Sequence, residues 1–337
     1  MSVRHTWSVR TVGFLAAALG AVFVAVGAAA AATAPPAMSS FGAWATAGSR
    51  VAFDATIGRR SGLWVQAFGS NQPRLLTTRC GEGNAPSQIA AGPSGSWACL
   101  TAVVGNTESF SAVDFVSATG SVRQVAAAGG TAGSIPQVVG DGAFLGYLRV
   151  TPAGVVQLFR ITSAGRARRV ADLPGVSAVP TATTQAASAA AVAANGTVAI
   201  RQVNGTVALF TTTGRALATV PARAASIALT SDRLVVRTVT RRLVVYGLRG
   251  GLVHDWPLGA ASFSNGLAAF DGYAAYLGAN KAVRLVKLAS GADRVVARSG
   301  TGWFWNGLSL QAPGIVAPLT AQHGSSFVST LRFVPTR

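Results

Sequence analysis

A short apolar strand motif recurs seven times along this chain, and this repetition constrains the fold more than any other feature. Successive copies start 36 to 54 residues apart. A period of this size is typical of β-propellers, in which one four-stranded blade is one repeat. The copies are SRVAFDA (49–55), SWACLTA (96–102), GAFLGYL (142–148), GTVAIRQ (196–202), DRLVVRT (232–238), GYAAYLG (272–278) and GIVAPLT (314–320).

A second unit follows each copy: a polar hairpin turn, an apolar strand, a tight Gly turn and a basic-apolar strand. Two examples are SGLWVQAFGSNQPRLLTT (61–78) and AVRLVKLASGADRVVA (282–297). The alternation of apolar and polar residues indicates half-buried β-strands. We therefore predict an all-β chain, a β-propeller of about seven four-stranded blades, with six as the alternative.

The last repeat ends at 329–337 without a full outer strand. The ring then closes either with a short last blade or with help from a segment near residues 38–44. A pair of β-sandwiches and a β-helix are the competing folds. Sandwiches need no fixed period near 40 residues, and β-helices have shorter repeats, so the propeller is favoured.

The first repeat, RVAFDATIGRRSGLWVQAFGSNQPRLLTT (50–78), resembles the TolB-like, WD40-like propeller repeat. That repeat runs as an "IAF" strand, a hairpin, an "IWV" strand, a Gly turn and "LT". The segment PSQIAAGPSGSWACLT (86–101) is similar to its "P-x-W-S-P-D-G" strand but lacks the Trp and the Asp. The resemblance covers one to two blades and implies a propeller with an envelope or interaction role. Because this family includes scaffolds and peptidase-associated domains, it does not assign a function.

The first 34 residues have the features of an export signal. Arg4 and Arg10 precede an apolar run over 12–32, and small residues stand at 30–32. These features predict a signal peptide, although a run of this length also approaches a membrane span. An uncleaved anchor is therefore the alternative, and membrane contact is expected only through this segment. No Cys stands directly after the apolar run, so a bacterial lipoprotein is excluded. We expect 35–337 to form the propeller, as a secreted or periplasmic monomer.

Cys80 and Cys99 are the two cysteines of the chain. Two cysteines in an exported protein usually pair, so we predict a disulfide between them. A metal site needs more ligands, and the chain has three His. We expect no metal and no cofactor.

The charge of the chain is strongly basic, with 28 Lys and Arg against 10 Asp and Glu. All but Lys281 and Lys287 of these cations are Arg, a bias typical of GC-rich bacterial genomes, so part of the +18 is compositional. In a propeller, the hairpins between second and third strands open on one face. They hold Arg59, Arg60, Arg241 and Arg242, which we predict as ligand-binding residues.

The turns between third and fourth strands open on the opposite face and are also basic. They contain Arg123, Arg166, Arg215 and Arg249. A protein that binds nucleic acid usually concentrates its positive charge in one patch. Because both faces are basic here, nucleic acid is disfavoured as a partner. An envelope protein or an anionic cell-surface polymer is the expected partner.

No catalytic motif is found in the sequence: it has no G-x-S-x-G elbow, no P-loop and no H-E-x-x-H. Three acids, Asp141, Asp232 and Asp271, stand at one repeat position before a strand. Asp is common there because it bonds nearby backbone N–H groups, and a ring of acids around the channel is the alternative. His254 and Asp255 are adjacent on an expected outer strand, where neighbouring side chains point to opposite faces.

Trp303, Phe304 and Trp305 form the densest aromatic cluster. Such residues either pack between blades or form a platform on which sugar rings stack. We therefore also assign Trp303 and Trp305 as candidate ligand-binding residues.

These observations favour a secreted or envelope-associated, non-catalytic propeller that acts as a protein- or ligand-binding scaffold. The first alternative is a propeller hydrolase or lyase with a site at the central channel, against which the scarcity of His and carboxylates argues. The second alternative is a carbohydrate-binding propeller.

Overall fold

Four-stranded antiparallel sheets repeat along the chain in the computed structural model, as the repeat predicts. The structure describes residues 36–80, 85–104, 109–176, 189–193, 195–258 and 266–336. The chain divides into two compact units, Met1–Thr33 and Ala34–Arg337, and all described residues belong to the second. The predicted signal or anchor therefore lies outside the described residues.

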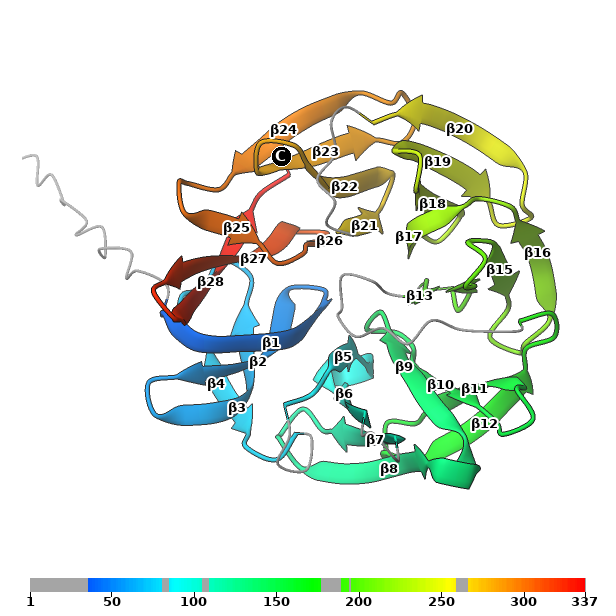
Figure 1. Ribbon diagram of the computed structural model, residues 1–337, viewed down its shortest axis with the longest axis horizontal. Helices are drawn as coiled ribbons and strands as arrows, with labels where there is room; N and C mark the ends of the chain where they lie inside the picture. The colour runs from blue at the N-terminus through cyan, green and yellow to red at the C-terminus, as the bar shows by residue number, and fades with distance from the viewer. Residues whose placement is uncertain are drawn as a thin grey trace, which may run out of the picture. The chain divides into compact units, whose positions relative to one another are not determined.

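Five blades each consist of four consecutive strands, which follow one another from the inner edge of the blade to its outer edge (Figure 1). Blade two has β5 (Gln88–Ala91), β6 (Trp97–Val104), β7 (Ser109–Val116) and β8 (Val122–Gly129). Blade three has β9 (Ser134–Gly140), β10 (Leu145–Val150), β11 (Val156–Ile161) and β12 (Ala167–Asp172). Blade four has β13 (Ala190–Val192), β14 (Val198–Arg201), β15 (Val207–Phe210) and β16 (Ala216–Val220). Blade five has β17 (Ala224–Leu229), β18 (Arg233–Thr238), β19 (Arg242–Gly247) and β20 (Leu252–Pro257). Blade six has β21 (Leu267–Phe270), β22 (Tyr273–Gly278), β23 (Ala282–Lys287) and β24 (Asp293–Arg298). Two short 3₁₀ turns, η1 (Pro93–Gly95) and η2 (Gly130–Ala132), lie beside blades two and three.

Blades seven and one share one eight-stranded sheet, which closes the ring. Blade one has β1 (Met38–Ala47), β2 (Arg50–Ile57), β3 (Arg60–Ala67) and β4 (Arg74–Thr77). Blade seven has β25 (Trp303–Trp305), β26 (Ser309–Gln311), β27 (Gly314–His323) and β28 (Ser326–Val334).

The closure combines the two possibilities that the sequence left open. Among the described residues, blade seven has no outer strand after β28, and Met38 at the start of β1 pairs with Ser329 of β28. The inner edge of blade seven is split, because β25 and β26 both pair with β27. The ring thus ends in a short blade, and the first strand of the chain completes it.

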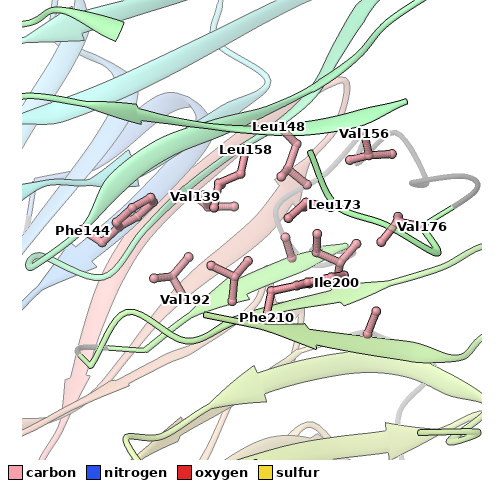
Figure 2. Packing of buried hydrophobic residues seen from close by; sticks show 13 residues of the cluster. Val139, Phe144, Leu148, Val156, Leu158, Leu173, Val176, Val192, Ile200 and Phe210 are labelled. Atoms are coloured by element: carbon pink, nitrogen blue, oxygen red, sulfur yellow. The ribbon is translucent and has the colours of Figure 1, made fainter. Parts of the chain in front are cut away.

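Apolar side chains of neighbouring blades pack face to face and form the core. Between blades three and four, Leu148 and Leu158 pack with Ile200 and Phe210, and each of the four is at most 1% exposed (Figure 2). The second strand of each blade contributes to the packing on both of its sides, since successive residues point to opposite faces. This explains why the seven second-strand motifs are almost wholly apolar.

Glycines in the turns between third and fourth strands bring neighbouring blades close together. A Cβ built on Gly214 would lie 2.0 Å from the Cβ of Ala171 in the preceding blade. Gly69, at the same position in blade one, has nothing within 4 Å of such a Cβ. The difference follows from the closure, because blade seven has no outer strand. The other close turn glycines are Gly120, Gly165, Gly250 and Gly291, which face Leu76, Phe115, Ala218 and Trp256.

Candidate functional site

The central channel of the propeller contains a cavity with a volume of about 250 Å³. Residues from the inner strands of all seven blades line it. Its polar lining residues include Thr46, Gln88, Gln137, Asp141, Ser226 and Gln311.

Two of these polar residues fasten neighbouring blades to one another. Gln88 donates from Nε2 to the Pro136 carbonyl (3.2 Å) and accepts from the Val138 N–H (3.2 Å). Gln137 repeats the arrangement one blade further, with the Ala190 carbonyl (3.3 Å) and the Ala189 N–H (3.0 Å). Because both glutamines are bonded to backbone, they serve the ring rather than a ligand.

Two buried polar atoms of the channel lining have no hydrogen-bond partner among the described residues. One is Oγ of Ser226, whose side chain is 3% exposed. The other is Oδ2 of Asp141, whose Oδ1 accepts from the N–H groups of Ala143 (2.9 Å) and Phe144 (2.8 Å). The channel can therefore offer a hydroxyl and a carboxylate oxygen to a small polar molecule.

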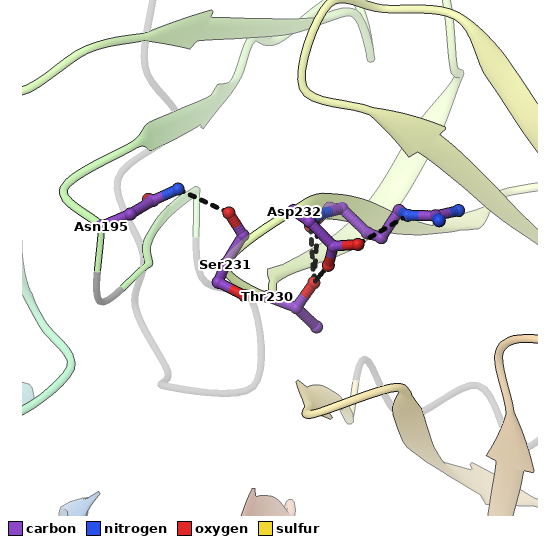
Figure 3. Close-up of polar contacts among 5 residues, drawn as sticks. Asn195, Thr230, Ser231 and Asp232 are labelled. Atoms are coloured by element: carbon purple, nitrogen blue, oxygen red, sulfur yellow. Dashed lines mark hydrogen bonds and ion pairs between the residues drawn. The ribbon is translucent and has the colours of Figure 1, made fainter.

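The three acids at one repeat position do not form a ring in the channel. Asp141 lines it, whereas Asp271 is exposed in a tight turn at φ +43°. Asp232 accepts from the Thr230 hydroxyl (2.9 Å) and forms an ion pair with Arg233 (3.0 Å), beside the Asn195–Ser231 contact (Figure 3). Burial raises the pKa of Asp232, but the bonds from Thr230 and Arg233 outweigh it and hold this pKa below its usual value. The structure thus favours the turn role.

The predicted cationic residues lie on one face, which we call the hairpin face because all hairpins between second and third strands end there. Arg59 and Arg60 are exposed in the hairpin of blade one, and Arg241 is exposed in that of blade five. Arg242 is less exposed and forms an ion pair with Asp255 (2.6 Å) on β20. The two pairs of arginines are therefore separated around the ring and do not make one cluster.

The predicted aromatic residues lie mainly in the core. Trp305 is 8% exposed, and its indole N–H donates to the Lys281 carbonyl (2.8 Å). Trp303 is half-buried against the same core cluster between blades six and seven. Phe304, which points the other way, is exposed. Only part of this cluster is thus accessible to a ligand.

The predicted disulfide between Cys80 and Cys99 is present, with a Cα–Cα distance of 6.2 Å. Cys99 lies on β6 and is fully buried, whereas Cys80 follows β4. The bond therefore connects the end of blade one to the second strand of blade two.

His254 and Asp255 do not form a catalytic pair. His254 stacks on Trp256 with 4.6 Å between ring centroids, and Asp255 is engaged by Arg242. Among the described residues, no group of three or more His, Cys, Asp or Glu could hold a metal ion. No helix within the described ranges is long and apolar enough to cross a membrane.

Asp54 has an unusual environment that the sequence does not reveal. It lies on β2 and faces Gly42 at an irregularity in the β1–β2 pairing; a Cβ on Gly42 would lie 2.9 Å from its Oδ2. Burial raises the pKa of the Asp54 carboxyl to about 6. The sequence signal for this environment is a single acid, Asp54, at an inward position of an otherwise hydrophobic strand motif.

The hairpin turns differ from the polar turns that we predict from the repeat. Several present an exposed apolar side chain, such as Val203 and Val239, at 68% and 64% exposure. The signal was an apolar residue inside a turn sequence, as in QVNGT (202–206), where Val203 precedes Asn-Gly. We call six such residues the apolar tips: Val103, Phe110, Val155, Val203, Val239 and Phe327.

Comparisons with known proteins identify the fold. No family model matches the sequence, and no curated protein matches it. Among solved structures, Sqt1 from Saccharomyces cerevisiae is similar with a TM-score of 0.53 and 12% identity, over 89% of this chain and 87% of that one. BamB from Moraxella catarrhalis is similar with a TM-score of 0.40 and 14% identity, over 85% and 80%. At these identities the likeness concerns the fold alone, and that fold is a β-propeller.

Proposed function

We propose that this protein is a secreted or envelope-associated, non-catalytic propeller that binds an anionic envelope partner, a protein or a cell-surface polymer, through its hairpin face. A propeller is in general a binding scaffold. The export signal predicted over 1–34 and the Cys80–Cys99 disulfide support an oxidising location outside the cytoplasm.

The exposure of Arg59, Arg60 and Arg241 on the hairpin face is the observation that carries this proposal. The described carboxylates near this face, Asp172 and Asp255, are both engaged in ion pairs with arginines. Glu82 and Glu108 lie outside the described residues. The face therefore has a surplus of cations that a polyanion can neutralise.

A pull-down from envelope extract at low and high salt tests the proposal. The variant Arg59→Gln/Arg60→Gln/Arg241→Gln/Arg242→Gln removes the candidate residues, and Arg123→Gln/Arg166→Gln/Arg215→Gln is a matched control on the opposite face. We expect the first variant to lose the partner and the control to retain it. Equal retention by both variants would overturn the proposal. If high salt abolishes binding to both variants equally, the basic surface is only generally adhesive.

A second candidate is a hydrolase or lyase site in the central channel. The unpartnered Oγ of Ser226 and Oδ2 of Asp141 at the cavity favour it. A screen of ester and glycoside substrates tests it: turnover that Asp141→Asn or Ser226→Ala abolishes would support this site, and no turnover would reject it for these substrates.

A further inference from the structure

Six of the eleven exposed large apolar side chains among the described residues, the apolar tips, lie on the hairpin face. Val203, Val239 and Phe327 are 68%, 64% and 48% exposed, and each lies at or beside a hairpin between second and third strands. In blade two, Val103 and Phe110 are both exposed and stand directly opposite each other across the β6–β7 pair. The opposite face has small polar turns, such as SATGS (117–121) and TTTGR (211–215), and two exposed large apolar side chains, Leu252 (63%) and Tyr273 (39%).

Hydrogen bonds fix the turns that carry Val203 and Val239. Beside Val203, Asn204 Oδ1 accepts from the Thr206 N–H (3.0 Å), and the Gly205 N–H donates to the Gln202 carbonyl (3.0 Å). The N–H of Val239 donates to the carbonyl of Arg223 (3.0 Å). A side chain fixed in an exposed position keeps its apolar surface in water, which costs free energy unless something covers it.

Cationic residues stand between the apolar tips. Arg59 and Lys281 are exposed in the hairpins of blades one and six, and Arg223 is exposed in the connection before blade five. Three cations of this face, Arg223, Arg241 and Lys281, adopt positive φ of +48°, +61° and +55°. Glycine or asparagine adopts this conformation at lower cost, so each position keeps a long basic side chain against the local preference.

We propose that the hairpin face docks on an anionic lipid bilayer, with the apolar tips inserted among the head groups and the cations bound to lipid phosphates. This rests on the proposed function because it uses the same cationic face. It puts a lipid surface in place of the protein or polymer, so the propeller itself, and not only the segment 1–34, would contact the membrane. Apolar residues for the acyl boundary and Lys or Arg for anionic head groups are the pair of features that interfacial binding uses. The tips come from five different blades around the ring, whereas a protein partner usually engages one compact cluster of anchor residues.

The path of the chain agrees with this orientation. Met38, the first residue of β1, pairs with Ile57, which pairs with Arg60 across the blade-one hairpin. The chain therefore enters the propeller on the hairpin face.

Hydrogen exchange of the full-length chain on vesicles tests this proposal. We compare vesicles of equal parts phosphatidylglycerol and phosphatidylcholine with vesicles of phosphatidylcholine alone. We expect slower amide exchange in 200–206 and 236–242 on the anionic vesicles only, and unchanged exchange in the turns 117–121 and 211–215. Local protection identifies the contacting face whether or not the N-terminal segment is retained.

Two variants separate the apolar and the cationic contributions. Val203→Ser/Val239→Ser/Phe327→Ser should abolish the protection. Arg59→Gln/Arg60→Gln should raise the lipid concentration for half-maximal protection by about 25-fold, because each cation near an anionic surface contributes about a fivefold factor. Arg123→Gln/Arg166→Gln is the matched control and should leave it unchanged. Urea unfolding midpoints equal to that of the unmodified chain show that the variants fold.

Three outcomes would overturn the lipid proposal: no protection on anionic vesicles, equal protection on both kinds of vesicle, or protection that the serine variant retains. If the arginine variant loses an envelope protein or polymer in the pull-down while the vesicles give no protection, the proposed function stands and the lipid assignment is wrong.

Discussion

The partly buried carboxylate of Asp54 destabilises the folded state when it is ionised. The strand motif RVAFDA puts this acid between two apolar positions, and the blade then buries it partly against the backbone of Gly42. Because burial removes water from the carboxylate without a compensating bond among the described residues, the protonated form is favoured and the pKa rises to about 6.

The variant Asp54→Asn should therefore be more stable than the unmodified protein at pH 7.5 and equally stable at pH 3.5. The folded pKa lies above the unfolded value of 3.8, so the unmodified protein loses stability as the pH rises from about 4 to about 6. The expected gain at pH 7.5 is about 1–3 kcal/mol, reduced by the partial exposure of the group. Urea unfolding at both pH values measures it; an equal gain at both would show that charge is not the cause.

At the residue scale, the sequence predicted which arginines are exposed in hairpin turns, but it did not predict which side chains form ion pairs. Arg59 and Arg60 are exposed because they stand in a hairpin turn, and the repeat alone placed them there. The repeat could not show that Arg242 meets Asp255, because this pairing depends on the register between β19 and β20. The burial of Trp305 depends on the β25–β27 pairing, which is equally hidden in the sequence.

At the scale of elements, the third-to-fourth turns act as spacers between blades. Gly214 has φ +80° and lies against Ala171 of the preceding blade, whereas Gly69 has φ +77° and nothing nearby. These two glycines share a backbone conformation and differ only in their surroundings.

Gly69→Ala should cost about 1 kcal/mol, the expense of a left-handed conformation for a residue with a Cβ. Gly214→Ala should cost about 2–4 kcal/mol, because the new methyl group overlaps the Ala171 methyl and the two blades must move apart. Guanidinium unfolding of both variants gives the difference. Equal losses would mean that the turn does not set the distance between blades.

The sequence predicted the second, third and fourth strands well, because each has a run of alternating or continuous apolar residues. It did not single out the inner strands. The strand β13 is the three residues Ala-Ala-Val, and the inner edge of blade seven is split into β25 and β26. Strands this short have no periodicity to recognise, and their pairing is set by the blade around them. The sequence therefore predicted a central channel but not most of the residues that line it.

At the scale of the whole molecule, the disulfide limits how far the first two blades can separate. It joins residues 19 apart in sequence, across the connection from blade one to blade two. A loop of this length contributes about 3 kcal/mol in the chain-entropy model. We expect Cys80→Ser/Cys99→Ser to lower the free energy of unfolding by about that amount. Thermal unfolding with and without a reductant measures it, and an unchanged midpoint would mean that the bond stabilises little beyond the ring itself.

The shared sheet of blades seven and one sets the order in which the ring can be completed. Met38 is synthesised early, but its pairing partner Ser329 is synthesised late. The β1–β28 pairing can therefore form only after most of the propeller has been made. Until then the outer edge of β1 is open to other chains, which is the usual starting point of strand-to-strand aggregation. Shortening β28 should thus leave the edges of β1 and β27 unpaired, so a late segment of the propeller protects an early one.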